Sequence, residues 1–437
     1  MADDARETGS PLNPTPAAKR IASIDVLRGF ALLGILVMNI PTFAYIEAAW
    51  LNPNVQGTDG APDRIAWLIS HLFFDLKMMA IFSMLFGTGI VMIRDRARER
   101  GRGPRVHYRR MLWLLLIGLA HAYLIWEGDI LVAYAMCGML LYVLARLRPR
   151  WLIPIGLALM LGAPVMNIPF GRMLEQGREL SLAAQADDAI EFTKAEQQLV
   201  DAYEDARKDF EFEPESFEKQ AATFTGSYAD RFAPRAKASL AWQTFLFLVW
   251  GVWRVGGLIV LGMGLFKLGL FSAHLAARTY ALLAVIGYAA GLPVIWFGAK
   301  EMINHNYDFV YLFQIGWWYN YAASILVALA HVSVVMLICR AGVLTPFRNA
   351  LSAVGRMALT NYLAQSIICA LLFYGYGFAL WGRLSRAELL AVVAAIWTAQ
   401  LLWSPLWLAR FRFGPMEWAW RSLTYWKRHP MRIDSRD

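Results

Sequence analysis

The chain of 437 residues is 58% hydrophobic and only 17% charged, whereas about a quarter of the residues in soluble globular proteins are charged. Long apolar runs recur from one end to the other, which excludes a soluble domain with a single anchor and indicates a polytopic membrane protein. The formal charge of +9 does not indicate nucleic-acid binding, because the basic residues lie in short segments between the apolar runs.

The N-terminal residues 1–20 are polar and lack the apolar segment of a signal peptide, so we predict a disordered cytoplasmic tail. Apolar runs of about 18–24 residues then predict an all-α bundle of about ten transmembrane helices. The predicted spans are 27–46, 70–93, 109–126, 130–146, 151–170, 241–266, 278–299, 315–339, 353–375 and 387–409.

The loop RDRARERGRGPRVHYRR after the second predicted span contains eight arginines and two acidic residues. Cytoplasmic loops of membrane proteins are enriched in Lys and Arg. We therefore expect this loop in the cytoplasm and, with ten spans, both termini on the same side. The expected location is the inner (plasma) membrane of the cell, in multi-pass form.

An acidic region interrupts the apolar pattern, with fifteen acidic and eight basic residues between positions 171 and 235. We predict an extracytoplasmic helical insert over residues 171–239, which either rests on the bundle or forms a lid over a site at the outer mouth. The insert separates two halves of five spans each, 21–170 and 240–412. The last segment, 413–437, is predicted as an interfacial helix with a basic cytoplasmic tail, and its Glu417 and Arg421 share one helical face.

Ionisable residues within the apolar runs are functional candidates, because each is costly in lipid unless it faces the bundle interior. In the first span, Asp25 and Arg28 lie one turn apart at the cytoplasmic entrance, where they form a local ion pair, a lipid-headgroup anchor or a docking point for an anion. Asn39 lies deeper in the same span. Its two alternative roles are a polar contact between packed helices and a part in a functional site.

The second and third spans carry further candidates. Asp75 shares a helical face with His71, and Lys77 lies too far from the span ends to reach water easily, so it needs an anionic partner or a polar cavity. His121 is followed by Asp129, whose carboxylate could orient the imidazole, which is the usual arrangement for a general base. A satisfied core histidine is the alternative.

The ninth span contains Arg356 near the cytoplasmic face and Asn361 and Gln365 deeper, four residues apart on one face. Asn39, Lys77 and His121 project to similar depths, so we expect them to converge on one interior cavity with Arg28 and Arg356 at its cytoplasmic mouth. The three cysteines lie inside apolar runs with no ligand spacing, which indicates core residues rather than a metal site or disulfides.

Several separated motifs resemble the YeiB family, whose C-terminal half is the domain of unknown function 418. They are SIDVLRGFALLGILVMNI, IFSMLFGTG, GLAHAYLIWEGDILVAYA and, near the C-terminus, VGRMALTNYLAQSIIC, FYGYGFALWG and GPMEWAWRSLTY. The opening helix is also similar to that of membrane acyltransferases of the acyltransferase-3 and heparan glucosaminide acetyltransferase types. That resemblance implies a bundle of ten or more helices that moves an acyl group from cytoplasmic acyl-CoA to an acceptor across the membrane. It implies Arg28 near the donor phosphates and His121 as base or acyl carrier.

One position departs from the acyltransferase-3 pattern. That pattern has a histidine about ten residues after the opening arginine, and this chain has Asn39 there. An asparagine cannot act as a general base at neutral pH. His121 is therefore the expected substitute, with Asn39 or Lys77 as hydrogen-bond donors to an oxyanion.

Three functions follow as hypotheses. The first is a membrane acyltransferase with acyl-CoA as co-substrate, no tightly bound cofactor, and a small-molecule or glycan acceptor. The second is a secondary transporter of a small solute, with Asp75, Lys77 and His121 as a relay. The third is a non-catalytic membrane scaffold whose polar residues only pack helices. The expected partner in every case is the lipid bilayer, not nucleic acid, and the sequence leaves the oligomeric state open.

Overall fold

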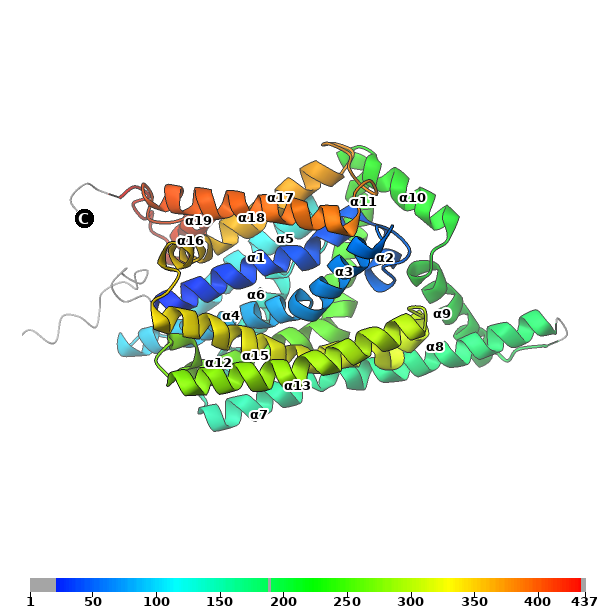
Figure 1. Cartoon of the computed structure of the whole chain (residues 1–437), viewed down its shortest axis with the longest axis horizontal. Helices are drawn as coiled ribbons and strands as arrows, with labels where there is room; N and C mark the ends of the chain where they lie inside the picture. Colours follow the sequence, from blue (N-terminus) through cyan, green and yellow to red (C-terminus); the bar gives the residue numbers. More distant parts are fainter. Residues whose placement is uncertain (1–20, 188–189, 434–437) are drawn as a thin grey trace, which may run out of the picture.

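The computed structural model describes residues 21–187 and 190–433, so the tail predicted over residues 1–20 lies outside the described residues. The described chain is helical and contains no β-strand, which confirms the all-α fold (Figure 1). The helices are α1 (Ala22–Ala44), α2 (Ala48–Leu51), α3 (Ala61–Ile69), α4 (Lys77–Glu99), α5 (Arg105–Leu124), α6 (Leu131–Leu141), α7 (Pro149–Met160), α8 (Gly162–Ala186), α9 (Lys194–Phe210), α10 (Pro214–Thr225), α11 (Tyr228–Ala241), α12 (Val252–Lys267), α13 (Ala277–Asn304), α14 (Phe309–Tyr311), α15 (Trp317–Ala341), α16 (Thr345–Arg356), α17 (Ala358–Phe373), α18 (Arg386–Leu408) and α19 (Pro415–Tyr425).

Some of these helices are interrupted by, or continue into, other helical forms. The π-helical segments are η2 (Ser70–Phe74), η4 (Trp242–Gly251) and η6 (Leu312–Gly316), and the 3₁₀ segments are η3 (Tyr142–Arg146) and η5 (Leu270–Ser272). Within the described residues, seven helices are long and apolar enough to cross a membrane, and α16 with α17, bent by 83°, brings the number up to eight. The protein is thus a multi-pass membrane protein, while the count of about ten spans and the cytoplasmic termini stay predictions.

The long helices lie side by side along the long axis of the bundle, and both ends of the described chain lie at the same end (left in Figure 1). The loop between α4 and α5, with its arginines, and α19 lie at that end as well, and we call it the basic end. Helices α2, α10 and α11 lie at the opposite end. All helices of the predicted insert after α8 therefore begin far from the basic end.

Helix α9 of the predicted insert begins with a capping box, in which Thr193 and Glu196 satisfy each other's backbone N–H groups. It packs on the C-terminal part of α8, where the Ser181 hydroxyl donates a 2.7 Å hydrogen bond to Glu204. This hydrogen bond holds the pKa of Glu204 below its usual range. The predicted amphipathic helix is thus fixed to the end of α8 by a specific polar contact.

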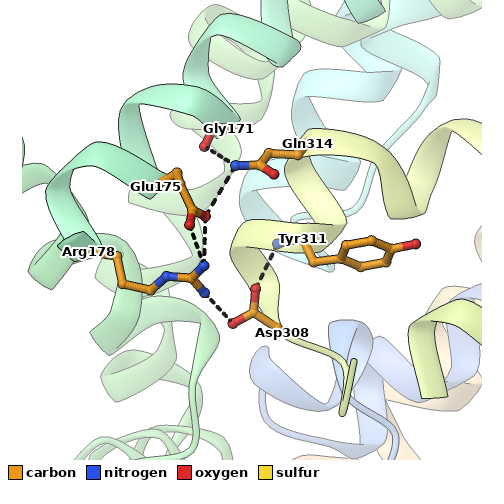
Figure 2. Close-up of polar contacts among 6 residues, drawn as sticks. All are labelled: Gly171, Glu175, Arg178, Asp308, Tyr311 and Gln314. Atoms are coloured by element: carbon orange, nitrogen blue, oxygen red, sulfur yellow. Dashed lines mark hydrogen bonds and ion pairs between the residues drawn. The ribbon is translucent and has the colours of Figure 1, made fainter. Parts of the chain in front are cut away.

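A cluster of ionic and amide side chains fixes α8 to the segment between α13 and α15 (Figure 2). Arg178 contacts Glu175 at 2.7 Å and Asp308 at 3.0 Å, and Gln314 donates to the same glutamate at 3.2 Å. Asp308 also accepts from the backbone N–H of Tyr311, which begins the next helical turn. The ion pairs are about a third exposed, so each adds little stability, and their main effect is to set the position of the segment.

Helices α1 and α16 cross with their backbones in direct contact at Gly29 and Gly355. A Cβ atom at Gly29 would overlap the carbonyl of Leu351, and one at Gly355 would overlap the carbonyl of Asp25. No residue other than glycine fits either position without moving a helix. The residues next to each glycine in the chain are therefore held at fixed positions beside the crossing.

Gly355→Ala is expected to push α16 away from α1 and to destabilise the protein by about 1–3 kcal/mol, the usual cost of overpacking a close contact. The measurement is the thermal unfolding midpoint of the purified protein in detergent. Gly103→Ala is the matched control, since a Cβ there meets no atom within 4 Å. Equal midpoints for the two variants would contradict the proposed crossing.

Candidate functional site

A cavity of about 210 Å³ lies between α1, α4, α5, α6, α16, α17 and α19, and it extends from the basic end into the bundle. Its entrance carries four arginines and one glutamate, and its walls deeper in are apolar. The entrance residues, which we call the arginine mouth, are Arg28, Arg110, Arg356, Glu417 and Arg421. The apolar walls include Leu32, Ile35, Phe82, Phe86, Met111 and Leu114. Such a graded lining suits a ligand with an anionic head and a less polar end.

The crossing of α1 and α16 places two of these arginines beside each other. Arg28 precedes Gly29 in α1, and Arg356 follows Gly355 in α16. Arg28 forms a 2.8 Å ion pair with Asp25 and reaches toward the carbonyl of Gly355 at 3.4 Å. The structure therefore brings Arg28 and Arg356 together at the entrance, with Asp25 paired to Arg28, while a role of these residues in binding stays a prediction.

Two further arginines of the mouth come from α5 and α19. The Arg110 guanidinium lies 3.7 Å from the centre of the Trp420 ring, and Trp420 donates its indole N–H to the Arg110 carbonyl at 2.9 Å. This pair fixes α19 against α5 and so brings Arg421 to the same entrance. Guanidinium groups in this number favour an oxyanion ligand such as a phosphate.

Glu417 partly offsets this positive charge. Its carboxylate accepts hydrogen bonds from the backbone N–H groups of Leu359 and Thr360 at 2.6 and 3.1 Å, so it caps the N-terminus of α17. The side chain is 6% exposed, and this burial raises the pKa of Glu417 above its usual range. The charge of the mouth consequently depends on pH.

Because protonation removes the negative charge of Glu417, the affinity of the mouth for an anion is expected to rise as the pH falls through the raised pKa. Sulfate is a suitable probe, since its own charge is constant over the range. Titration calorimetry across mildly alkaline to mildly acidic pH measures the effect. Glu417→Gln is expected to flatten the pH dependence, and an unchanged slope in that variant would be inconsistent with this assignment.

A histidine–aspartate pair lies behind the residues that line the inner end of the cavity. His121 Nδ1 and Asp129 Oδ2 are 2.7 Å apart, and both side chains are only 1% exposed. The other carboxylate oxygen accepts the backbone N–H of Val132 at 2.8 Å, in the first turn of α6. A carboxylate can only accept, so Nδ1 carries a proton, and in the neutral imidazole Nε2 then has a free lone pair. Within the described residues Nε2 is buried and has no hydrogen-bond partner.

Tyr362 lies between this pair and the cavity. Its ring centre is 5.2 Å from that of His121, and its side chain lines the cavity together with Ile130 and Leu131, which follow Asp129 directly. His121 and Asp129 thus stand behind the innermost wall of the cavity. The arrangement has the geometry of an oriented general base beside a binding pocket.

Lys77 and Asp75 belong to a different cluster. Lys77 is completely buried and donates to the carbonyl of His71 and to the Asn320 side chain, both at 2.6 Å. Asn320 in turn donates to Asp75 at 2.8 Å, and His71 lies 3.3 Å from the same carboxylate. A nearby buried cation, Arg254, is bonded to α15 rather than to this group.

This cluster lies at a break in the predicted second span. The π-helical η2 ends at Phe74, and Leu76 has a left-handed backbone with φ of 62°, before α4 begins at Lys77. The break frees carbonyl groups, of which that of Phe73 accepts from His331 at 2.9 Å. The expected convergence of Asn39, Lys77 and His121 on one cavity is not found, because the break turns Lys77 toward α15 and Asn39 does not line the cavity.

Asn361 and Gln365 connect α17 with α18 instead of facing the cavity. Asn361 donates to Ser404 at 3.0 Å and accepts from Trp403 at 2.8 Å, and Gln365 donates to Gln400 at 2.9 Å. These buried amides replace water contacts that lipid cannot supply. Their place in the structure is that of interhelical hydrogen bonding.

The site residues predicted from the sequence did not include Arg110, Tyr362, Glu417 or Arg421, which all line the cavity. Arg110 is the last of the eight arginines in the basic loop, and nothing in the loop sequence distinguishes it from the others. Tyr362 is one of many aromatic residues in apolar runs. The four-residue spacing of Glu417 and Arg421 was the available signal. It indicated that both residues share one face of a helix, but it did not indicate which helix that face contacts.

Fold and site together define a polytopic helical membrane protein with a buried histidine–carboxylate pair behind a basic cavity. Its sequence is 30% identical to the uncharacterized protein YxaH of Bacillus subtilis, over 97% of this chain and 98% of that one. It is also 30% identical to the uncharacterized protein YeiB of Escherichia coli, over 93% and 96%. Residues 265–427 match the family model described as protein of unknown function DUF418. The chain belongs to the YeiB family. No solved structure matches it at a significant level.

Proposed function

We propose that the protein is an acyltransferase of the inner membrane, which takes an acyl group from acyl-CoA at the basic end and passes it to a hydroxyl or amine acceptor. The observation that carries this proposal is the His121–Asp129 pair, whose free Nε2 lies behind Tyr362 at the inner end of the arginine-lined cavity. The resemblance of the opening helix to membrane acyltransferases supports the same reading.

The dimensions of the cavity suit the end of a thioester donor. Arg28 and Ile35 both line it, and seven residues of α1 span about 10 Å. A volume of about 210 Å³ corresponds to about seven water-sized groups. The acyl thioester end fits inside, while the nucleotide and its phosphates stay at the arginine mouth, on what we take to be the cytoplasmic side.

The proposed reaction uses the pair as a general base. His121 Nε2 takes the proton of the acceptor hydroxyl or amine as that group attacks the thioester carbonyl, and Asp129 stabilises the imidazolium that forms. Tyr362, whose side chain lines the cavity, is the candidate donor to the oxyanion of the tetrahedral intermediate. When the intermediate collapses, the C–S bond breaks and the proton passes from His121 to the CoA thiolate. The products are the acylated acceptor and free CoA.

His121→Gln is expected to lower the rate of acyl transfer by about 10²–10⁴-fold, the usual contribution of a general base, with donor affinity unchanged. Asp129→Asn should lower the same rate, because the imidazole loses its orienting acceptor. The measurement is release of CoA from acyl-CoA by purified protein, with acceptor mixtures extracted from the host membrane. Full activity of His121→Gln would contradict the proposal.

The broken helix at Asp75–Leu76 favours transport as the second candidate, since discontinuous helices with buried charges form ion and substrate sites in transporters. Solute flux in proteoliposomes distinguishes the two. Flux that needs an ion gradient, persists in His121→Gln and is lost in Lys77→Met would identify a transporter.

Gly89 gives a direct test of the cavity as the donor site. It lines the cavity, and a Cβ added there meets no atom within 4 Å, so a larger side chain enters empty space rather than a neighbouring helix. Gly89→Leu is expected to weaken acyl-CoA binding at least about tenfold, or 1.4 kcal/mol, without loss of thermal stability. Gly103→Leu is the matched control in open space outside the cavity. Equal acyl-CoA affinities for the two variants would exclude the cavity as the donor site.

A further inference from the structure

Helix α11 of the predicted insert covers the end of α5 that carries His121. The last carbonyls of a helix have no donors within the helix itself. Here three side chains of α11 supply them: Ser239 donates to Ala122 at 3.0 Å, Arg235 to Tyr123 at 2.9 Å and Tyr228 to Leu124 at 2.8 Å. These acceptors follow His121 directly in the chain, so α11 lies within about one helical turn of the histidine–aspartate pair.

Two arginines of α11 are buried at this contact, and the first forms an ion pair although its Nε has no hydrogen-bond partner among the described residues. Arg231 is 2% exposed and contacts the Glu127 carboxylate at 2.7 Å and the Tyr374 hydroxyl at 2.9 Å. Its guanidinium also lies 3.8 Å from the ring centre of Phe224 and 4.0 Å from that of Tyr374. The charge of this arginine is compensated within the protein.

The second arginine is not compensated. Arg235 is 1% exposed, and only its Nε donates, to the Tyr123 carbonyl. In the described part of the chain, its Nη1 and Nη2 are both buried and have no hydrogen-bond partner. The Tyr228 ring, 4.7 Å away, covers one face of the group. A buried guanidinium with two unpaired nitrogens is costly, since its desolvation is not repaid by hydrogen bonds.

The two acidic side chains near this end of α5 are each paired with a residue other than Arg235. Glu127 pairs with Arg231, and Asp129 pairs with His121. The free edge of Arg235 thus carries the two parallel N–H donors that fit a phosphate or a carboxylate in bidentate fashion. Arg235 donates to the carbonyl of Tyr123, two residues after His121 in α5. The arginine mouth, in contrast, lies at the basic end of the bundle.

We propose that Arg235 is the anchor of a second anion site, which holds the phosphate or carboxylate group of the acceptor. The identification of the ligand as an acceptor rests on the proposed acyltransferase function, while the anion site itself does not. The acceptor class is then an anionic molecule, whose oxyanion binds Arg235 while its hydroxyl or amine reaches His121.

The test uses the full chain in neutral detergent with Arg28→Gln and Arg356→Gln as background, so that the arginine mouth contributes less to anion binding. Inorganic phosphate and succinate are titrated as soluble probes, and phosphatidic acid in mixed micelles as the lipid probe. Saturable binding of at least one probe is expected, and Arg235→Gln is expected to weaken it at least tenfold. A preference for phosphatidic acid over both soluble probes identifies a lipid headgroup as the source.

Arg172→Gln is the matched control, because Arg172 is exposed on α8, outside this contact. Arg235→Lys keeps the charge but loses the bidentate geometry, so it is expected to weaken binding severalfold and it remains informative if Arg235→Gln does not fold. Unchanged affinity in Arg235→Lys, or in folded Arg235→Gln, overturns the site, as does the absence of binding by all three probes.

Acyl-CoA binding by the protein with an intact mouth is measured separately. Anion binding that depends on Arg235, combined with no acyl-CoA binding, keeps the site and rejects the acyltransferase function. Acyl-CoA binding and CoA release, combined with anion affinity independent of Arg235, keep the function and reject the site.

Discussion

The backbone contact between Gly29 of α1 and Gly355 of α16 is the constraint on which the cavity depends. Because neither position has space for a Cβ, the two helices cross at the shortest distance that their backbones allow. Arg28 and Arg356 flank this contact, and the sharp bend between α16 and α17 follows it. Glu417 then caps α17 from α19, so α19 and its part of the entrance are connected to this crossing through α17.

The bundle separates its buried charges into clusters, each with its own partners. His121 is paired with Asp129, Arg231 with Glu127, and Lys77 with Asn320 beside Asp75. In lipid an unpaired charge costs several kcal/mol, so this pairing is what allows so many ionisable groups inside an apolar bundle. His121 Nε2 and the two Nη atoms of Arg235 are among the buried nitrogens of the described residues that lack a hydrogen-bond partner, and both side chains lie at the C-terminal end of α5. Chemistry and ligand binding are expected where pairing is incomplete.

Much of the site could be predicted from spacing along the chain. Asp25 and Arg28 lie one turn apart, and their ion pair needs only helix geometry. The His121–Asp129 contact spans the short turn between α5 and α6, which brings the two side chains to the same end of the bundle. The grouping of Lys77 with His121 failed for another reason. The depth of a residue along a helix can be counted from the sequence. The direction in which its side chain points after a break such as the one at Leu76 cannot.

Composition and residue spacing were sufficient to predict the class of protein, the polar residues that are costly in lipid, and the pairs of side chains that local helix geometry brings together. The tertiary structure alone decided which distant residues meet: Arg110 and Arg421 with Arg28, Tyr362 with His121, and Arg235 with the end of α5. The physical reason is that each of these contacts depends on how helices rotate and cross. Those angles come from the packing of small residues and side chains across the whole bundle, which no single segment encodes.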